Sequence, residues 1–297
     1  MLLAGECVVA CSRSREASRG KATPVEASRG AVDAGEPSPV ESAGAPPLDP
    51  VRPTAHGLPG GVEVQPLGDA TLDLAAVEGV VVRVDLGRVA LEPRAVPNQR
   101  LGELASDPSL ALAVNAGYFE SDGAPSGLLA GPSVRFGNAN RRGGSGIVVV
   151  RAGRAALVPY TSSFSLDPSA ELAVQSGPRL LEADGRAGIR SDDGQRAPRT
   201  VLCVAEGGRR LDLVLLWTRG DSTRGPGLLA LSRALRAPLV ASDGRRCEQA
   251  LNLDGGPSTG FVYGSSVAER PAPEHPPLGP VPWALVVRAR PSRPATP

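Results

Sequence analysis

The chain has 297 residues, enough for one large domain or two small ones. Its 36 glycines and 30 prolines accompany a hydrophobic fraction of 41%, so we expect one part to fold and another part to remain unfolded. The charges of the 32 basic and 31 acidic residues almost cancel, so the chain has no large net positive charge that would attract a nucleic acid or an anionic membrane.

Scarce residue types exclude several kinds of active site. Lys21 is the only lysine, and the only histidines, His56 and His275, lie among prolines and glycines. The expected folded region therefore lacks the residues for a phosphate-loop lysine, a Schiff base, a paired-histidine zinc site or a Ser-His-Asp triad. Any general acid or base should be a carboxylate, and the sequence indicates no cofactor.

The first eleven residues resemble an export signal. They are mostly apolar, and VVAC, which ends at Cys11, is similar to the sequence before the lipid-modified cysteine of bacterial lipoproteins. The signal is incomplete, because no basic residue precedes the apolar stretch and Glu6 interrupts it. We expect export to the cell envelope or periplasm and leave a lipid anchor at Cys11 open. No stretch approaches the roughly 20 apolar residues of a membrane span.

Residues 12–61 are mainly Ser, Arg, Glu, Pro, Gly and Ala, and ASRG occurs twice. This composition buries too little apolar surface to offset the entropy of the chain. We predict a disordered linker, either a surface tether or a plain terminal extension. We interpret the last residues, 291–297, as a tail after the final predicted strand.

Between residues 62 and 290, short β-branched runs separated by turn residues predict strands and hairpins. The clearest runs are 80–85, 110–119, 147–151, 199–217 with a turn at 206–208, 250–253, 260–263 and 283–288. Helical periodicity is convincing only over 99–105 and 227–236. We predict one α+β domain, mainly β, with a mixed sheet, a few helices and one helix crossing between the strands near 217 and 250.

Four cysteines do not make a disulfide scaffold in a chain of this size, and their spacing fits no metal site. Two of them, Cys203 and Cys247, lie in the predicted domain. They are expected either to form a disulfide or to remain two separate buried thiols.

Two of the predicted strands end in polar sequences in the first half of the domain. NAGYF begins at Asn115, and a purely structural interpretation is a tight turn followed by aromatic side chains of the core. AVQSGPRLL places Gln175 in an apolar strand ahead of backbone amides that can face a ligand. A β-bulge explains the second sequence equally simply.

Two further polar sequences follow. PRT places Arg199 and a hydroxyl at the head of a strand, and arginine suits bidentate binding of phosphate or carboxylate, although a surface arginine is the simpler reading. In ALNLDGGPSTG, alternation directs Asn252 and Asp254 to one face. The glycines at 255 and 256 let a ligand approach the backbone closely.

Taken together, NAGYF with a following PSGL, then QSGPRLL, RT and CEQALNLDGGPST resemble the phosphodiester glycosidase family over residues 79–288. The resemblance implies a mixed α+β fold with a cleft lined by these strand ends and a carbohydrate or phosphoglycan substrate. Two features depart from the family pattern. Tyr118 stands where Phe or Met is common, and a more usual aromatic-containing segment is replaced by NANRRGGSGIVVV from Asn138.

The implied reaction is hydrolysis of a sugar 1-phosphodiester at the anomeric carbon. The leaving phosphate monoester has a second pKa of about 6, so it departs with little protonation. One carboxylate and one cationic clamp then suffice, and we assign these roles to Asp254, as general base or oxocarbenium stabiliser, and to Arg199. The substrate-binding candidates are Asn115, Gly117, Tyr118, Gln175, Thr200, Asn252, Gly255, Gly256 and Ser258.

Glu120 and Asp221 are candidates for a second carboxylate that the sequence does not rank. Two other functions stay open. In the first, the same cleft of an envelope module binds glycan or phosphoglycan without turnover. In the second, Asp254 and a neighbouring carboxylate hold a divalent cation that activates water.

Overall fold

The computed structural model describes residues 57–68, 74, 76–239 and 244–290. The signal-like segment 1–11 with Cys11, the linker up to residue 56 and the tail 291–297 lie outside the described residues. Within the described ranges, no helix is long and apolar enough to cross a membrane. Leu58 is buried in the core, so packing begins shortly before the predicted domain boundary at residue 62.

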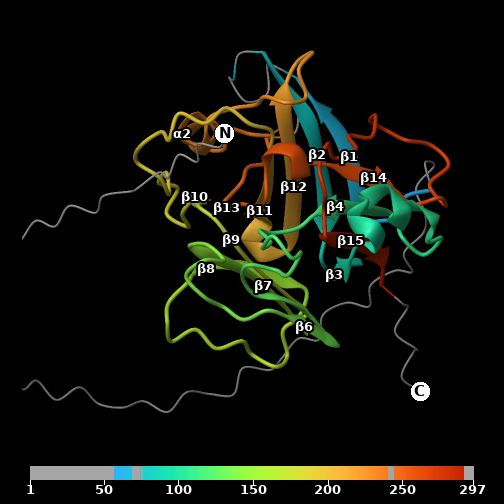
Figure 1. Ribbon diagram of the computed structural model, residues 1–297, viewed down its shortest axis with the longest axis horizontal. Coiled ribbons are helices and arrows are strands. Elements are labelled where there is room, and N and C mark those ends of the chain that lie inside the picture. Colours follow the sequence, from blue (N-terminus) through green and yellow to red (C-terminus); the bar gives the residue numbers. More distant parts are fainter. Residues whose placement is uncertain (1–56, 69–73, 75, 240–243, 291–297) are drawn as a thin grey trace, which may run out of the picture. The chain divides into compact units, whose positions relative to one another are not determined.

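The described chain forms three antiparallel sheets (Figure 1). The first has the order β1 (Val62–Leu67), β2 (Val77–Asp85), β12 (Arg210–Thr218), β11 (Arg199–Ala205), β13 (Gln249–Asn252) and β10 (Arg179–Leu181). The second has the order β14 (Phe261–Tyr263), β4 (Leu112–Asn115), β15 (Trp283–Ala289) and β3 (Val89–Ala95). The third has the order β6 (Val134–Phe136), β5 (Leu129–Gly131), β9 (Leu172–Ser176), β7 (Gly146–Arg151) and β8 (Arg154–Pro159).

Helical structure is sparse in the described chain. It comprises α2 (Leu228–Ala234) and four short 3-10 turns, η1 (Pro97–Gln99), η2 (Leu101–Ser106), η3 (Glu206–Gly208) and η4 (Gly256–Ser258). The predicted helix over 99–105 is therefore a pair of 3-10 turns. Asn98 and Gln99 have φ angles of 48° and 55°, a left-handed conformation that interrupts any regular helix there.

The mainly β character is confirmed, but the mixed sheet is wrong, because every strand pair between described residues is antiparallel. Tight turns such as η3, between β11 and β12, force neighbouring strands to run in opposite directions. The predicted crossing helix is present as α2. It connects β12 to β13, and β11 lies between those two strands.

The six-stranded sheet is buried on both faces. Val82 and Leu213 are paired in register on one face and belong to the central core, which residues of all three sheets share. Val81 and Val214 are paired on the other face and belong to the cluster that contains Leu231 of α2. A polar side chain at the end of a central strand therefore lies close to apolar core, where it needs a hydrogen-bonding partner.

A disulfide joins Cys203 on β11 to Cys247 just before β13. The two cysteines therefore form a disulfide and are not two separate buried thiols. The bond lies in the same apolar cluster as α2 and links β11 to the segment that enters the neighbouring strand β13.

Replacing both cysteines by alanine should lower the free energy of unfolding by about 4 kcal/mol, because the bond closes a loop between residues 44 positions apart. Chemical denaturation of the Cys203→Ala/Cys247→Ala protein measures the loss. Reductant should destabilise the unsubstituted protein by a similar amount and leave the double variant unchanged. A loss below about 1 kcal/mol would contradict a stabilising cross-link.

Candidate functional site

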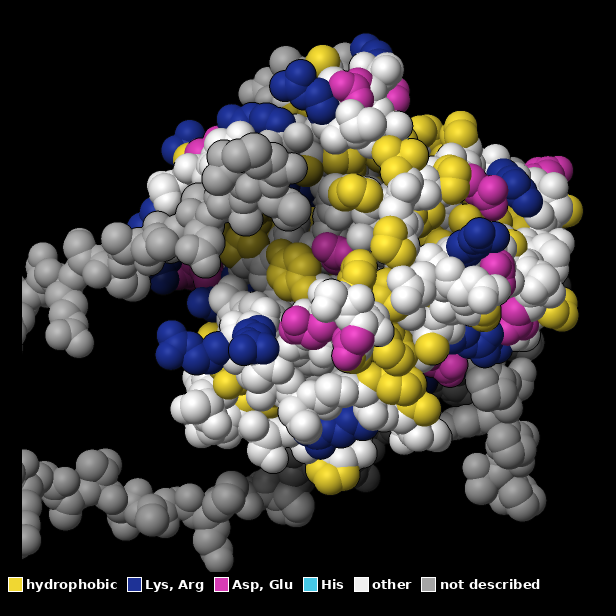
Figure 2. Space-filling model, in the orientation of Figure 1, with side chains coloured by type: hydrophobic (Ala, Val, Ile, Leu, Met, Phe, Trp, Pro, Cys, Tyr) yellow, Lys and Arg dark blue, Asp and Glu magenta, His cyan; other side chains and the backbone are white. Residues whose placement is uncertain are grey.

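The four polar sequences meet at one end of the six-stranded sheet. Backbone hydrogen bonds tie the segment 252–256, which leaves β13, to three other segments. The bonds run from Asn252 N to Pro178 O (3.0 Å), Leu253 N to Thr200 O (2.8 Å), Asp254 N to Ala116 O (3.2 Å) and Gly256 N to Pro198 O (2.8 Å). Figure 2 shows a hollow near the middle of this face, in the area where Figure 1 labels β11 and β13, with hydrophobic and acidic side chains exposed in it.

Asn115, the last residue of β4, is buried and fully used in this junction. Its Nδ2 donates to the backbone oxygen of Asp254 at 2.8 Å. Its Oδ1 accepts from Thr200 Oγ1 at 2.8 Å and from the Gly260 amide at 3.1 Å. One amide therefore fixes the Asp254 turn to two sheets, and contact of Asn115 with a substrate stays a prediction.

Asp254 is a partly buried residue of this junction. Burial raises its pKa, and hydrogen bonds from Ser258 and from the Gly255 amide act in the opposite direction. The Gly255 amide donates to Oδ1 at 3.0 Å. Gly256 has a φ of 58° and open space where a side chain would lie, so the turn beside Asp254 leaves room for a ligand.

Arg199 is a buried cation, with 5% of its surface exposed. Its Nε donates to Pro226 O and its Nη2 to Gln195 O, both at 3.1 Å. No carboxylate of the described chain forms an ion pair with it. Burial lowers its pKa, yet a guanidinium keeps its charge in proteins. A fixed cation without an ion-pair partner is a favourable place for an anion.

Tyr118 and Asn252 form the side of the site next to the Gly177 turn. The phenol donates to Gly177 O, and Asn252 Nδ2 donates to the phenol oxygen at 3.1 Å and to Gly177 O at 3.0 Å. Asn252 Oδ1 is buried and has no hydrogen-bond partner among the described residues. Burial raises the pKa of Tyr118, on which the charges of Asp254 and Arg199 also act, so the phenol keeps its proton next to both charges.

Three other predicted site residues have structural contacts around the junction. Gln175 Oε1 accepts from the Leu128 and Asn140 amides at 3.2 and 3.1 Å, and its Nε2 donates to two carbonyls. Thr200 is fully buried and donates to Asn115. A Cβ at Gly117 would lie 2.8 Å from Gln175 O, so the backbones approach closely there. Their contacts with a substrate stay predictions.

Asp193 is a site residue that the sequence analysis did not single out. Its charge favours the charged form of Arg199 and raises the pKa of Tyr118. Its Oδ1 accepts from the amide of Gln195, whose carbonyl holds Arg199. The only available signal was the acidic pair in SDDGQ shortly before Arg199, which reads as an ordinary exposed turn.

The two candidates for a second catalytic carboxylate, Glu120 and Asp221, have no contact with Asp254 or Arg199 among the hydrogen bonds and ion pairs of the described chain. Glu120 is exposed, and Asp221 accepts from the amide and hydroxyl of Thr223 in a turn. No group of three or more His, Cys, Asp or Glu side chains in the described chain is arranged to hold a metal ion.

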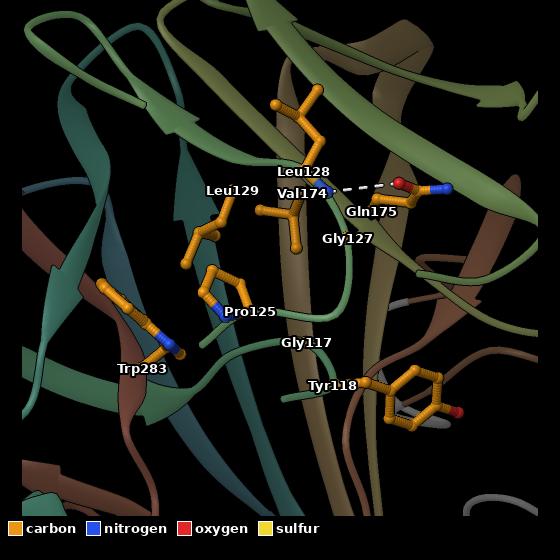
Figure 3. Close-up of a pocket in the computed structure, with 9 residues that line it drawn as sticks. All are labelled: Gly117, Tyr118, Pro125, Gly127, Leu128, Leu129, Val174, Gln175 and Trp283. Carbon is orange, nitrogen blue, oxygen red and sulfur yellow. Dashed lines mark hydrogen bonds between the residues drawn. The ribbon is translucent and has the colours of Figure 1, made fainter. Parts of the chain in front are cut away.

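A small cavity lies behind Tyr118 (Figure 3). It has a volume of about 10 Å³, roughly one water molecule, so it does not admit a sugar. Its lining includes Pro125, Leu129 and Trp283, and the Tyr118 ring points away from these residues. The indole Nε1 of Trp283 donates to Gly123 O at 2.7 Å. The cavity therefore belongs to the packing that supports the NAGYF turn.

Comparison with known proteins gives a family and a related fold. The family model described as phosphodiester glycosidase matches residues 109–288. The catalytic domain of zebrafish N-acetylglucosamine-1-phosphodiester alpha-N-acetylglucosaminidase, auto-inhibited by its pro-peptide, has a similar structure, with a TM-score of 0.54 and 17% identity over 77% of this chain and 84% of that chain. A hypothetical protein from Synechocystis has a TM-score of 0.48 and 16% identity over 77% of this chain and 62% of that chain. No curated protein matches.

Asn115→Ala should lower the free energy of unfolding by about 2 to 4 kcal/mol, because it removes the side-chain partner of the Asp254 carbonyl and the Gly260 amide and leaves the Thr200 hydroxyl with Thr259 alone. Denaturant titration gives the value. The exposed Asn138 offers a matched control, and Asn138→Ala should change stability by less than about 0.5 kcal/mol. Equal effects of the two substitutions would show that the Asn115 amide does not hold the junction.

Proposed function

Since the chain belongs to the phosphodiester glycosidase family, we propose that it hydrolyses a sugar 1-phosphodiester at the anomeric carbon. The products are the free sugar and a phosphate monoester. The observation that carries this proposal is the buried Arg199, which lacks an ion-pair partner in the described chain and lies within electrostatic reach of Tyr118, as Asp254 does. A cation and a carboxyl group in one cleft match a substrate with a phosphate next to its reacting carbon.

Arg199 binds the phosphate in this proposal. Two backbone carbonyls orient the guanidinium before the substrate arrives, so little side-chain freedom is lost on binding. Its remaining N–H groups donate to the non-bridging oxygens and stabilise the charge that collects on the leaving phosphate. The leaving group therefore needs no strong general acid.

Asp254 acts on the water. Its carboxylate accepts a proton as the water oxygen forms a bond to the anomeric carbon, and the bond between that carbon and the phosphoryl oxygen breaks. The electron pair of the broken bond leaves with the phosphate monoester. The partial positive charge that develops on the sugar is also stabilised by the nearby carboxylate. Asp254 then releases its proton to solvent.

The polar groups around Asp254 supply contacts to the sugar. Tyr118 keeps its proton, and Asn252 Oδ1 is an acceptor with no partner in the described chain. The turn is open at Gly256, whereas a Cβ at Gly255 would lie 2.8 Å from Pro198 O. The Ser258 hydroxyl lies beside Asp254. The family supports a carbohydrate-type substrate, and the identity of the sugar is part of the proposal.

The two alternatives make different predictions. A module that only binds glycan or phosphoglycan would not turn over any member of a panel of sugar 1-phosphodiesters. A catalyst that depends on a divalent cation would lose turnover on chelation and recover it when the cation is restored. Retained turnover with chelator supports the mechanism proposed for Asp254 and Arg199.

We propose that the protein acts outside the cytoplasm. The Cys203–Cys247 disulfide supports this location, because such bonds form and persist mainly in oxidising compartments. The lipid anchor at Cys11 stays a prediction.

Arg199→Lys should lower kcat/KM about 10-fold to 100-fold, because an ammonium group cannot reproduce the fork that binds two phosphoryl oxygens. Steady-state kinetics on an activated sugar 1-phosphodiester measure the change. The exposed Arg100, replaced by lysine, is the control and should keep the original kinetics. An Arg199→Lys protein that is folded and equally active would refute the phosphate clamp.

Asp254→Asn should lower kcat by about 10² to 10⁴. Burial raises the folded-state pKa of Asp254, so its contribution to stability falls as pH rises from the unfolded-state pKa through the folded-state pKa. Removal of the charge should therefore leave the melting temperature at neutral pH equal or higher. The acidic limb of the kcat/KM profile should also disappear.

Rate and melting temperature should be measured on the same preparation, with the exposed Asp184→Asn as control. A stable and fully active Asp254→Asn protein would rule out the mechanism. A protein with a lowered melting temperature but unchanged activity in its folded fraction would make Asp254 a purely structural residue.

A further inference from the structure

Residues 138–145, which we call the arginine loop, are anchored by many hydrogen bonds. Asn140 Oδ1 accepts from the amides of Arg142 and Gly143 at 2.7 and 3.0 Å, and Asn140 Nδ2 donates to Ser126 O at 2.7 Å. Gln175 Nε2 donates to Asn140 O at 2.6 Å. The backbone of this loop is therefore held in one conformation, although the loop has no regular secondary structure.

The arginine loop lies directly beside the candidate site. A Cβ at Gly144 would lie 2.1 Å from Ser176 O and 2.7 Å from Gly177 N, so the two backbones touch. Gly177 O is the acceptor for both Tyr118 and Asn252. The Gly177 turn therefore contacts the arginine loop on one side and the proposed substrate-binding side chains, Tyr118 and Asn252, on the other.

Arg141 and Arg142 project from this fixed loop as exposed side chains. Neither has a side-chain hydrogen bond or ion pair within the described ranges, whereas other surface arginines such as Arg151 and Arg186 pair with aspartates. Figure 2 shows basic side chains at the lower left of the hollow, on the side where Figure 1 places β7 and β8. Two adjacent cations without counter-charges attract an anion, and guanidinium groups match phosphate geometry.

We propose that Arg141 and Arg142 form a second anion subsite, which receives a further phosphate on the sugar side of the substrate, next to Tyr118 and Asn252. The proposal rests on the proposed function, in which Arg199 holds the phosphate at the reacting carbon. The substrate class is then a phosphoglycan with several phosphates, of which one is cleaved at Arg199 and the next is bound at the arginine loop.

Two anions of different length test the subsite. Isothermal titration calorimetry on the full chain compares inorganic phosphate, which offers one anionic group to the Arg199 clamp, with tripolyphosphate, which offers two further phosphates to a neighbouring cationic subsite. Arg141→Ala/Arg142→Ala should lower the affinity for tripolyphosphate about tenfold and leave that for inorganic phosphate within about twofold. The difference should shrink as salt is added.

A matched control removes the same charge elsewhere. Arg100 and Arg233 are exposed, and neither side chain has a hydrogen bond or ion pair in the described chain. Arg100→Ala/Arg233→Ala should therefore keep the tripolyphosphate affinity. Equal losses in the two double variants, or no loss at the arginine loop, would overturn the subsite.

The outcomes also separate this inference from the proposed function. Binding of tripolyphosphate that depends on Arg141 and Arg142, without binding of inorganic phosphate, would support the subsite and count against the clamp at Arg199. Inorganic phosphate that binds through Arg199 while tripolyphosphate binds no more tightly would overturn the subsite alone. Failure to bind either anion would overturn both.

Discussion

The side-chain amide of Asn115 is the contact on which the architecture of the site depends. It joins the end of β4, in the four-stranded sheet, to β11 and to the turn after β13, in the six-stranded sheet. All of its hydrogen-bonding capacity lies in a region that water does not reach, so loss of one partner leaves another group unsatisfied. The position of Asp254 is therefore a consequence of how the two sheets meet.

The same burial also changes the pKa values of the two charged groups of the site. Taking Asp254 out of water raises its pKa, and taking Arg199 out of water lowers the pKa of that group, so both charged forms are disfavoured by their surroundings. Their hydrogen bonds to backbone only partly offset this cost. A substrate that carries negative charge and a carbon that becomes positive would compensate both groups at once, which is the physical basis for proposing a phosphodiester as substrate.

Rigid loops give the site its walls. The Gln175 side chain forms four hydrogen bonds with the backbone of neighbouring segments, and the glycines at 144 and 177 allow those segments to come into contact. The result is a fixed arginine loop next to Tyr118. Binding at such a wall loses little conformational entropy, so differences in loop sequence among relatives can change the preferred substrate without changing the fold.

The sequence by itself determined the strand-rich domain, the positions of most strands, the arginine at the head of β11 and the turn with Asp254 after β13, because these depend on local alternation and turn residues. It did not determine that the strand pairs among the described residues are all antiparallel, that Cys203 pairs with Cys247, or that Asp193 lies near Arg199. The Asn115 amide bonds to an atom 139 positions away, and pattern reading does not reveal such a partner. Only the tertiary structure decides which polar side chains are used up inside the protein and which stay free for a ligand, since that choice depends on contacts between segments far apart in the chain.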